Sequence, residues 1–186
     1  MAYTLEQFVA DLDRITRAES DATVITERVA PLLAELVKHP ESIPAEYRRS
    51  PDGQRGRYML HRAPLFNISS VVWGPGDNAK AHNHDTWGLV GVHENELQET
   101  RFVRLDDGSK EGHAELEVKG VNRNQSGMVS TLLAPENDIH EMLNVTKKNT
   151  VEVHVYGKEL VNMQRLQFDV ATRSVKFFAS AKYDNC

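Results

Sequence analysis

Two histidines separated by one residue, His82 and His84, are the first residues in this sequence that could carry chemistry. Alternate residues of a β-strand point to the same side, so a His-x-His pair on a strand directs two imidazoles toward one point. Neutral imidazole is a ligand of iron, zinc, copper and nickel ions. A pair of ligands needs a third, and the candidate is His140 in the segment 135–144. The three histidines therefore predict a metal site.

The residues around these histidines resemble the two sequence motifs of cupins, which are β-barrel proteins. The first motif is glycine, five residues and His-x-His, with a glutamate three or four residues later. Gly88 or Leu89 stands at that glutamate position. The second motif is Pro-x-Gly-x-x-His-x-x-x-Asn, and Asn137 replaces its glycine. The other fixed positions are filled by Gly76, Pro135 and Asn144.

The missing glutamate leaves three neutral ligands and no protein carboxylate. Such a site keeps the charge of the metal high and leaves about three positions of an octahedron free. These positions suit a substrate thiolate and O2 together, because the thiolate supplies the anionic ligand that the protein does not. A soft sulfur donor is a compatible ligand for a redox metal ion that has open coordination positions.

Over nearly its whole length the chain resembles the cysteine dioxygenase family, and within it the bacterial 3-mercaptopropionate dioxygenases. The resemblance implies an Fe(II) enzyme that binds a small thiol as thiolate and adds both atoms of O2 to its sulfur, forming a sulfinate. The segments that carry the resemblance are 72–76, 82–91, 138–140 and 154–157, with 168–172 less specific.

The resemblance also implies catalytic roles for His154 and Tyr156. In the family a Ser-His-Tyr set on one strand places a tyrosine hydroxyl near the iron. Here Glu152 stands at the serine position and is a charged, stronger partner for His154. Some cysteine dioxygenases crosslink this tyrosine to a cysteine near the first motif, but this chain has Gly88 there and its single cysteine, Cys186, far away. The glycine places the chain nearer to the mercaptopropionate branch.

Arginine suits the carboxylate of a thiol acid, because its guanidinium can form two parallel hydrogen bonds with it. By the resemblance, Arg165 stands where the mercaptopropionate branch has an arginine. Arg57 stands where the cysteine branch has one, with Arg55 and Arg62 as alternatives for this position. If both Arg57 and Arg165 point inward, a dicarboxylate such as mercaptosuccinate becomes a candidate. If only Arg165 does, 3-mercaptopropionate is favoured, and Gly88 disfavours cysteine.

Capping and periodicity predict two helices in the N-terminal part of the chain. Thr4 and Gln7 form a capping-box pattern, and apolar residues at helical spacing follow. A second helical pattern ends at His39-Pro40, because the residue before a proline disfavours helical geometry. Pro31 is a candidate kink or break inside this second helix.

Short apolar segments separated by turn residues predict a β-barrel in the remainder. Asp106-Asp107-Gly108 is expected to be a hairpin turn. The fold class is therefore mainly β, a cupin double-stranded β-helix (jelly-roll barrel, 57–180) after two N-terminal α-helices (1–40), in one domain of residues 1–186. The expected strands are 57–61, 65–73, 87–92, 97–105, 116–118, 128–133, 151–156, 166–170 and 175–178.

The composition fits a globular protein and restricts its partners. With 186 residues, 40% hydrophobic and 26% charged, the chain can bury a full core. Its net charge of −5 disfavours nucleic acid and anionic membranes, and no apolar run approaches the roughly 20 residues of a membrane span. Without a signal-peptide pattern or a second cysteine to pair with Cys186, we expect a cytoplasmic protein without disulfides. The expected partners are a thiol and O2. Whether the protein forms a homo-oligomer stays an open question at this stage.

Two other functions remain open at this stage. One is a zinc- or manganese-dependent cupin isomerase or lyase, which the missing motif glutamate disfavours. The other is a non-catalytic cupin that binds a small molecule, such as a sensor. This reading is disfavoured because the chain has little room for an attached DNA-binding domain.

Overall fold

Two α-helices form the N-terminal part of the computed structural model, which describes residues 3–186. The first, α1 (Leu5–Ala18), begins at Thr4, and Thr4 and Gln7 form the expected capping box. The second, α2 (Ala22–Lys38), is capped by the side chain of Asp21. It continues through Pro31 as one helix, so of the two possibilities at this residue, a kink or a break, the break is wrong. Pro31 is exposed, and the amide hydrogen bond lost there falls on a side that water can reach.

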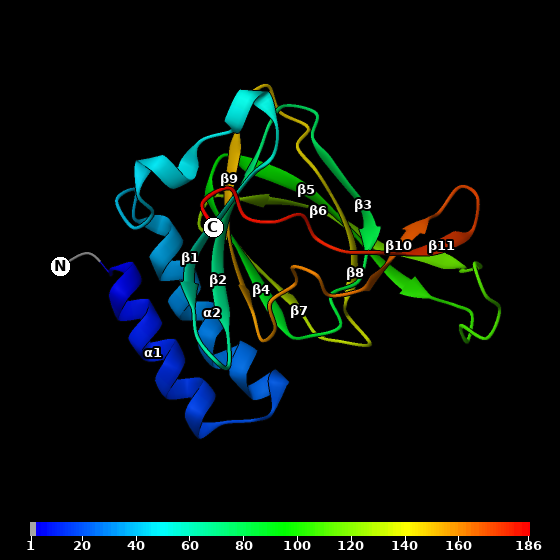
Figure 1. Cartoon of the computed structure of the whole chain (residues 1–186), viewed down its shortest axis with the longest axis horizontal. Coiled ribbons are helices and arrows are strands. Elements are labelled where there is room, and N and C mark those ends of the chain that lie inside the picture. The colour runs from blue at the N-terminus through cyan, green and yellow to red at the C-terminus, as the bar shows by residue number, and fades with distance from the viewer. Residues whose placement is uncertain (1–2) are drawn as a thin grey trace.

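The strands form two antiparallel sheets, confirming the mainly β fold (Figure 1). One sheet has the order β1-β2-β9-β4-β7 and the other β11-β10-β3-β8-β5-β6. Two short 3-10 helices, η1 (Ala45–Arg48) and η2 (Pro51–Gly53), precede them. The strands are β1 (Gly56–Arg62), β2 (Asn67–Trp73), β3 (Asn78–His82), β4 (Gly88–Glu94), β5 (Glu96–Arg104), β6 (Leu116–Gln125), β7 (Val129–Leu132), β8 (Ile139–Leu143), β9 (Thr150–Tyr156), β10 (Arg165–Asp169) and β11 (Ser174–Phe178).

The helices cover the outer face of the five-stranded sheet, and the inner face is left for the site. Val153 and Val155 of β9 belong to the same buried apolar cluster as Leu12 and Leu33 of the helices. Successive residues of a strand point to opposite faces, so Glu152, His154 and Tyr156 face the interior of the barrel. Within the described residues, no helix is long and apolar enough to cross a membrane.

The connection between β5 and β6 joins a hairpin, as expected, because the two strands pair antiparallel. The loop contains Asp106-Asp107-Gly108 and spans residues 105–115. The Asp106 carboxylate organises this loop by accepting hydrogen bonds from the backbone N–H groups of Gly108 (3.0 Å) and Glu115 (2.7 Å). Aspartate side chains that accept from nearby backbone amides are typical of such turns.

Candidate metal centre

The three predicted histidines meet at one point inside the barrel. The ring centroids of His82, His84 and His140 lie 4.8 to 4.9 Å apart. One ligand nitrogen from each ring lies within 4.8 Å of the other two. This group, found among residues 3–186, contains three histidines and no carboxylate.

The elements that bring the rings together differ from the expectation. His82 is the last residue of β3 and pairs directly with His140 of β8. His84 lies beyond the end of that strand, so the expectation that both residues of the His-x-His pair lie on one strand is wrong. The carboxylate of Asp138 accepts hydrogen bonds from the backbone N–H groups of His84 (3.0 Å) and Asp85 (2.9 Å). These bonds hold the loop after β3 against the start of β8.

Each histidine uses its Nδ1 atom for a bond to an oxygen acceptor. An Nδ1 that faces an acceptor carries the hydrogen, so Nε2 presents its lone pair. This arrangement fixes both the tautomer and the orientation of a metal-binding ring. The acceptors for His82, His84 and His140 are the Lys80 carbonyl (2.8 Å), the Asp138 carboxylate (3.1 Å) and the Glu99 carboxylate (2.8 Å).

The surroundings keep two of these rings neutral. Burial lowers the pKa of His84 to about 4. Burial and the neighbouring imidazoles lower the pKa of His82 well below its ordinary value. Neutral, oriented imidazoles are the form that binds a divalent transition metal, so the residues present fit such an ion.

Glu99 on β5 is a site residue that the sequence analysis missed. Its side chain is almost fully buried, and its carboxylate accepts from His140 (2.8 Å), Ser130 (2.7 Å) and Asn124 (2.9 Å) and pairs with Arg101 (2.8 Å). Burial alone would raise its pKa, but the hydrogen bonds from His140 and Ser130 and the electrostatic attraction of His140 and Arg101 lower it to about 2. The Glu99 carboxylate is therefore a buried anion that contacts Nδ1 of His140 and is not itself one of the metal ligands.

On β9, three alternate residues form a hydrogen-bonded line that ends at the histidines. The Tyr156 hydroxyl lies 3.0 Å from Nδ1 of His154, and Nε2 of His154 lies 3.0 Å from Oε2 of Glu152. The same oxygen of Glu152 accepts a hydrogen bond from Nε1 of Trp73 (2.8 Å). Tyr156 stacks on His84 with a centroid distance of 5.4 Å. The glutamate at the family's serine position is thus fully buried and linked to Tyr156 through His154.

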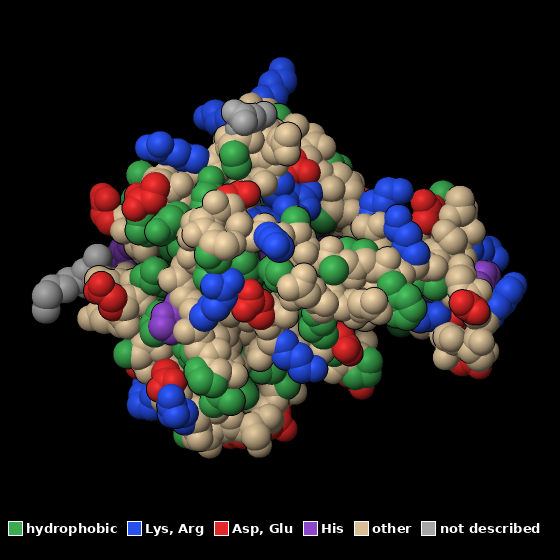
Figure 2. Space-filling view, viewed as in Figure 1, with side chains coloured by type: hydrophobic (Ala, Val, Ile, Leu, Met, Phe, Trp, Pro, Cys, Tyr) green, Lys and Arg blue, Asp and Glu red, His purple; other side chains and the backbone are tan. Residues whose placement is uncertain are grey.

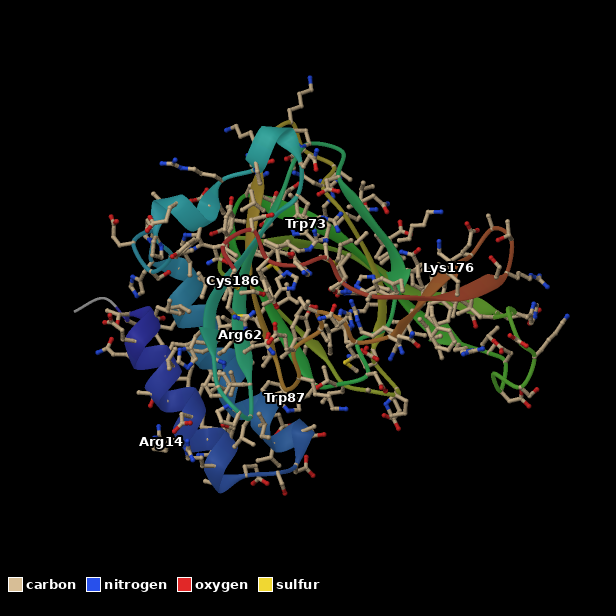
Figure 3. All side chains as sticks on the ribbon, viewed as in Figure 1. Arg14, Arg62, Trp73, Trp87, Lys176 and Cys186 are labelled. Carbon is tan, nitrogen blue, oxygen red and sulfur yellow. The ribbon has the colours of Figure 1, made fainter. Side chains whose placement is uncertain are left out.

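Gly88 leaves room for the Tyr156 ring. The two residues are paired on β4 and β9, and a Cβ atom at Gly88 would lie 2.5 Å from Cδ1 of the tyrosine. A side chain there would displace the ring. The single cysteine, Cys186, is exposed and lies 3.3 Å from Nη1 of Arg62, beside β1 (Figure 3). The expectation that no crosslink to Tyr156 forms stays a prediction.

The histidines and both predicted arginines line one cavity of about 540 Å³. Arg57 lines it, and among the described residues its guanidinium has no hydrogen-bonding or ionic partner. Arg55 also lines it, but two hydrogen bonds of 2.8 and 2.6 Å hold it to Asp77. Arg62 instead pairs with Glu159 at the surface (2.9 Å). Of the three alternatives for this position, Arg57 is therefore the one free to meet a ligand.

Arg165, the first residue of β10, is nearly fully buried in the cavity wall. Its guanidinium donates to the Asn83 carbonyl and the Ser180 hydroxyl, both at 2.6 Å, and lies over the Phe178 ring. Its buried Nε has no partner among the described residues. An unpaired buried donor is costly, so this group suits an acceptor such as a ligand carboxylate.

Two facing antiparallel sheets with three inward histidines define a cupin barrel, the double-stranded β-helix. More narrowly, the chain belongs to the cysteine dioxygenase type I family, whose model matches residues 3–168. The cysteine dioxygenase family predicted from the resemblance is therefore confirmed, and the mercaptopropionate branch within it stays a prediction.

Three solved structures similar to this chain are distant in sequence. An oxalate oxidase in complex with glycolate is 20% identical, with a TM-score of 0.43 and 59% of this chain covered. The protein TT1209 from Thermus thermophilus is 15% identical (60% of this chain, 90% of that chain, TM-score 0.45). A cupin superfamily protein from Desulfitobacterium hafniense is also 15% identical (66% and 89%, TM-score 0.44). The matched part spans 53% of the oxalate oxidase chain.

Proposed function

We propose that this protein is a non-heme Fe(II) thiol dioxygenase that converts a small thiol carboxylate and O2 to the sulfinate. The observation that carries the proposal is that three histidines, with no carboxylate in the ligand group, line the same cavity as Arg57 and Arg165. Family membership supports the same reaction class. The metal would be held by Nε2 of His82, His84 and His140. When bound, Fe(II) supplies the redox chemistry that activates O2 and an open position for the thiolate.

The protein residues would bind the substrate and orient it at this centre. Arg165 would donate hydrogen bonds to the carboxylate of the thiol acid, and this would direct the sulfur toward the histidines. Tyr156, held by His154, would place its hydroxyl beside the reacting atoms, and burial raises the pKa of Tyr156 so that it keeps its proton. The reaction RS⁻ + O2 → RSO2⁻ balances without another reductant, because the sulfur provides all the electrons that oxygen accepts.

Two thiol acids are the main substrate candidates. We favour 3-mercaptopropionate, whose single carboxylate matches Arg165. Mercaptosuccinate is the second candidate, because the guanidinium of Arg57 also lines the cavity and has no partner among the described residues. The second carboxylate of mercaptosuccinate would form an ion pair with Arg57.

Anaerobic reconstitution with Fe(II), followed by O2 uptake with a panel of thiols, tests this function. We expect uptake with 3-mercaptopropionate or mercaptosuccinate, less with cysteine, and a product whose mass has increased by that of O2. Protein loaded with zinc is the matched control and should be inactive. A loaded protein that consumes no O2 with any of the three thiols would rule out the dioxygenase and leave a metal-binding cupin of another function.

Replacing Arg165 with alanine should weaken substrate binding and leave the iron content unchanged. Losing a charged bidentate partner costs roughly 1.5–3 kcal/mol, so KM should rise about 10- to 100-fold. Steady-state kinetics and a colorimetric iron assay check the two parts. Arg173→Ala is the control, because that arginine pairs with Glu115 on the exposed surface. Unchanged kinetics in Arg165→Ala would remove this residue from the substrate site.

A further inference from the structure

The last residues of the chain form part of the cavity wall. The C-terminal segment, residues 179–186, crosses the open side of the barrel and ends beside β1 (Figure 1). In the space-filling view of the same face, Lys and Arg side chains are visible near the centre, where this segment crosses (Figure 2). The family model matches only residues 3–168, so the segment lies outside the matched part. It nevertheless contributes four residues to the cavity lining, Ala179, Ser180, Ala181 and Tyr183.

Two residues fasten the C-terminal segment to β1, which is the edge strand of its sheet. The backbone N–H of Asp184 donates to the Arg57 carbonyl, and its carboxylate accepts from the Arg57 N–H, both at 2.7 Å. The side-chain amide of Asn185 accepts a hydrogen bond from the Met59 N–H and donates one to the Met59 carbonyl, both at 2.9 Å. The segment is therefore held almost as an additional strand would be.

This fastening places two hydroxyl groups in the wall of the cavity that both arginines line. The Ser180 hydroxyl accepts a hydrogen bond from Arg165 (2.6 Å) and so holds its guanidinium. Tyr183 is half-buried and lines the same cavity as Arg57 and Arg165. Burial raises the pKa of Tyr183, so the hydroxyl keeps its proton and can donate.

We propose that the C-terminal segment determines substrate specificity by adding the Tyr183 hydroxyl as a third donor for the substrate carboxylate, beside Arg57 and Arg165. This inference rests on the proposed function, because it concerns recognition of the same thiol acid. Two guanidiniums offer only donors and a protonated tyrosine hydroxyl can offer one more, which matches a carboxylate because its oxygens only accept. Ser180 acts through Arg165 as a positioning residue.

The variant Tyr183→Phe tests the donor while keeping the ring. We expect KM for 3-mercaptopropionate to rise about 10- to 100-fold, the cost of one hydrogen bond to a charged group, while kcat changes by less than about twofold. The affinity of the metal-free protein for propionate, measured by NMR titration, should fall by the same factor. Lys182→Ala is the matched control, because Lys182 is the exposed neighbour on the same segment.

A second variant tests the fastening. Asp184→Ala should raise KM and speed hydrogen exchange at the Arg57 amide, and Asp184→Asn, which keeps one acceptor oxygen, should largely restore both. If Tyr183→Phe binds propionate as tightly as the unchanged protein, the proposal is overturned. If the unchanged protein oxidises no thiol but its propionate affinity still depends on Tyr183, the recognition role stands and the dioxygenase function fails.

Discussion

Replacing His82 with alanine is expected to abolish both iron binding and O2 uptake while the fold survives. Removing a group that merely orients a metal ligand costs roughly 10- to 100-fold in metal affinity, so losing one of three ligands should cost more. The fold should survive because His82 is only partly buried and ends β3, where its side chain bonds only to the nearby Lys80 carbonyl. Without the ion, neither thiolate nor O2 has a site at which to react.

Three measurements separate these effects. An iron assay after reconstitution should show near-zero metal, an oxygen electrode should show no thiol-dependent uptake, and circular dichroism should show an unchanged spectrum. His113→Ala is the control, since His113 lies in the loop between β5 and β6 and outside the metal centre. Normal turnover in His82→Ala would contradict the ligand assignment.

Replacing Glu99 with alanine is expected to weaken both the metal centre and the folded state. The metal affinity should fall roughly 10- to 100-fold, because Nδ1 of His140 loses the carboxylate that orients it. The free energy of unfolding should fall by about 3–5 kcal/mol, because Arg101 stays buried without its carboxylate partner. Glu99→Gln keeps the shape and one acceptor oxygen and should be milder in both respects.

Urea denaturation of the metal-free protein and a metal-competition titration measure the two losses. The control is Glu96→Ala on the same strand, because its ion pair with Arg123 is exposed and should be worth at most about 1 kcal/mol. Stability and iron affinity that match the unchanged protein would show that Glu99 does not support His140.

The same carboxylate predicts how stability depends on pH. The pKa of Glu99 is lowered from 4.5 to about 2 in the folded protein. Its contribution is therefore complete above about pH 4.5 and is lost as the pH falls toward 2, and linkage gives it a size of about 3 kcal/mol. The metal-free protein should lose stability steeply across this window, and Glu99→Gln should lose less. Equal slopes for the two proteins would contradict this assignment.

Short-range sequence patterns were enough to predict the fold class, the family and the three histidines that the structure brings together. The capping box at Thr4 and the motifs around His82, His84 and His140 are short-range patterns, and local spacing is enough to recognise them. The roles proposed for the metal ligands and for Arg57 stay predictions, although the structure places all of them in one cavity.

The groups that support these residues come from distant parts of the chain and could not be predicted from local patterns. Glu99 is 41 residues from His140, and the Asp184 carboxylate that holds Arg57 is 127 residues from it. Contacts at such separations depend on strand register and on where a loop crosses the barrel, and a local pattern specifies neither. For Glu99 the one available signal was a charged residue at a buried position of an alternating strand.

The incorrect expectation about His84 has the same origin. His-x-His spacing predicted one continuous strand, but the carboxylate of Asp138, 54 residues away, turns the chain at His84 instead. Asp106 likewise organises the hairpin loop between β5 and β6 by accepting a hydrogen bond from an amide nine residues ahead. Local sequence determines which residues can bind a metal or form a turn, and the long-range hydrogen bonds of the folded chain decide which geometry they adopt.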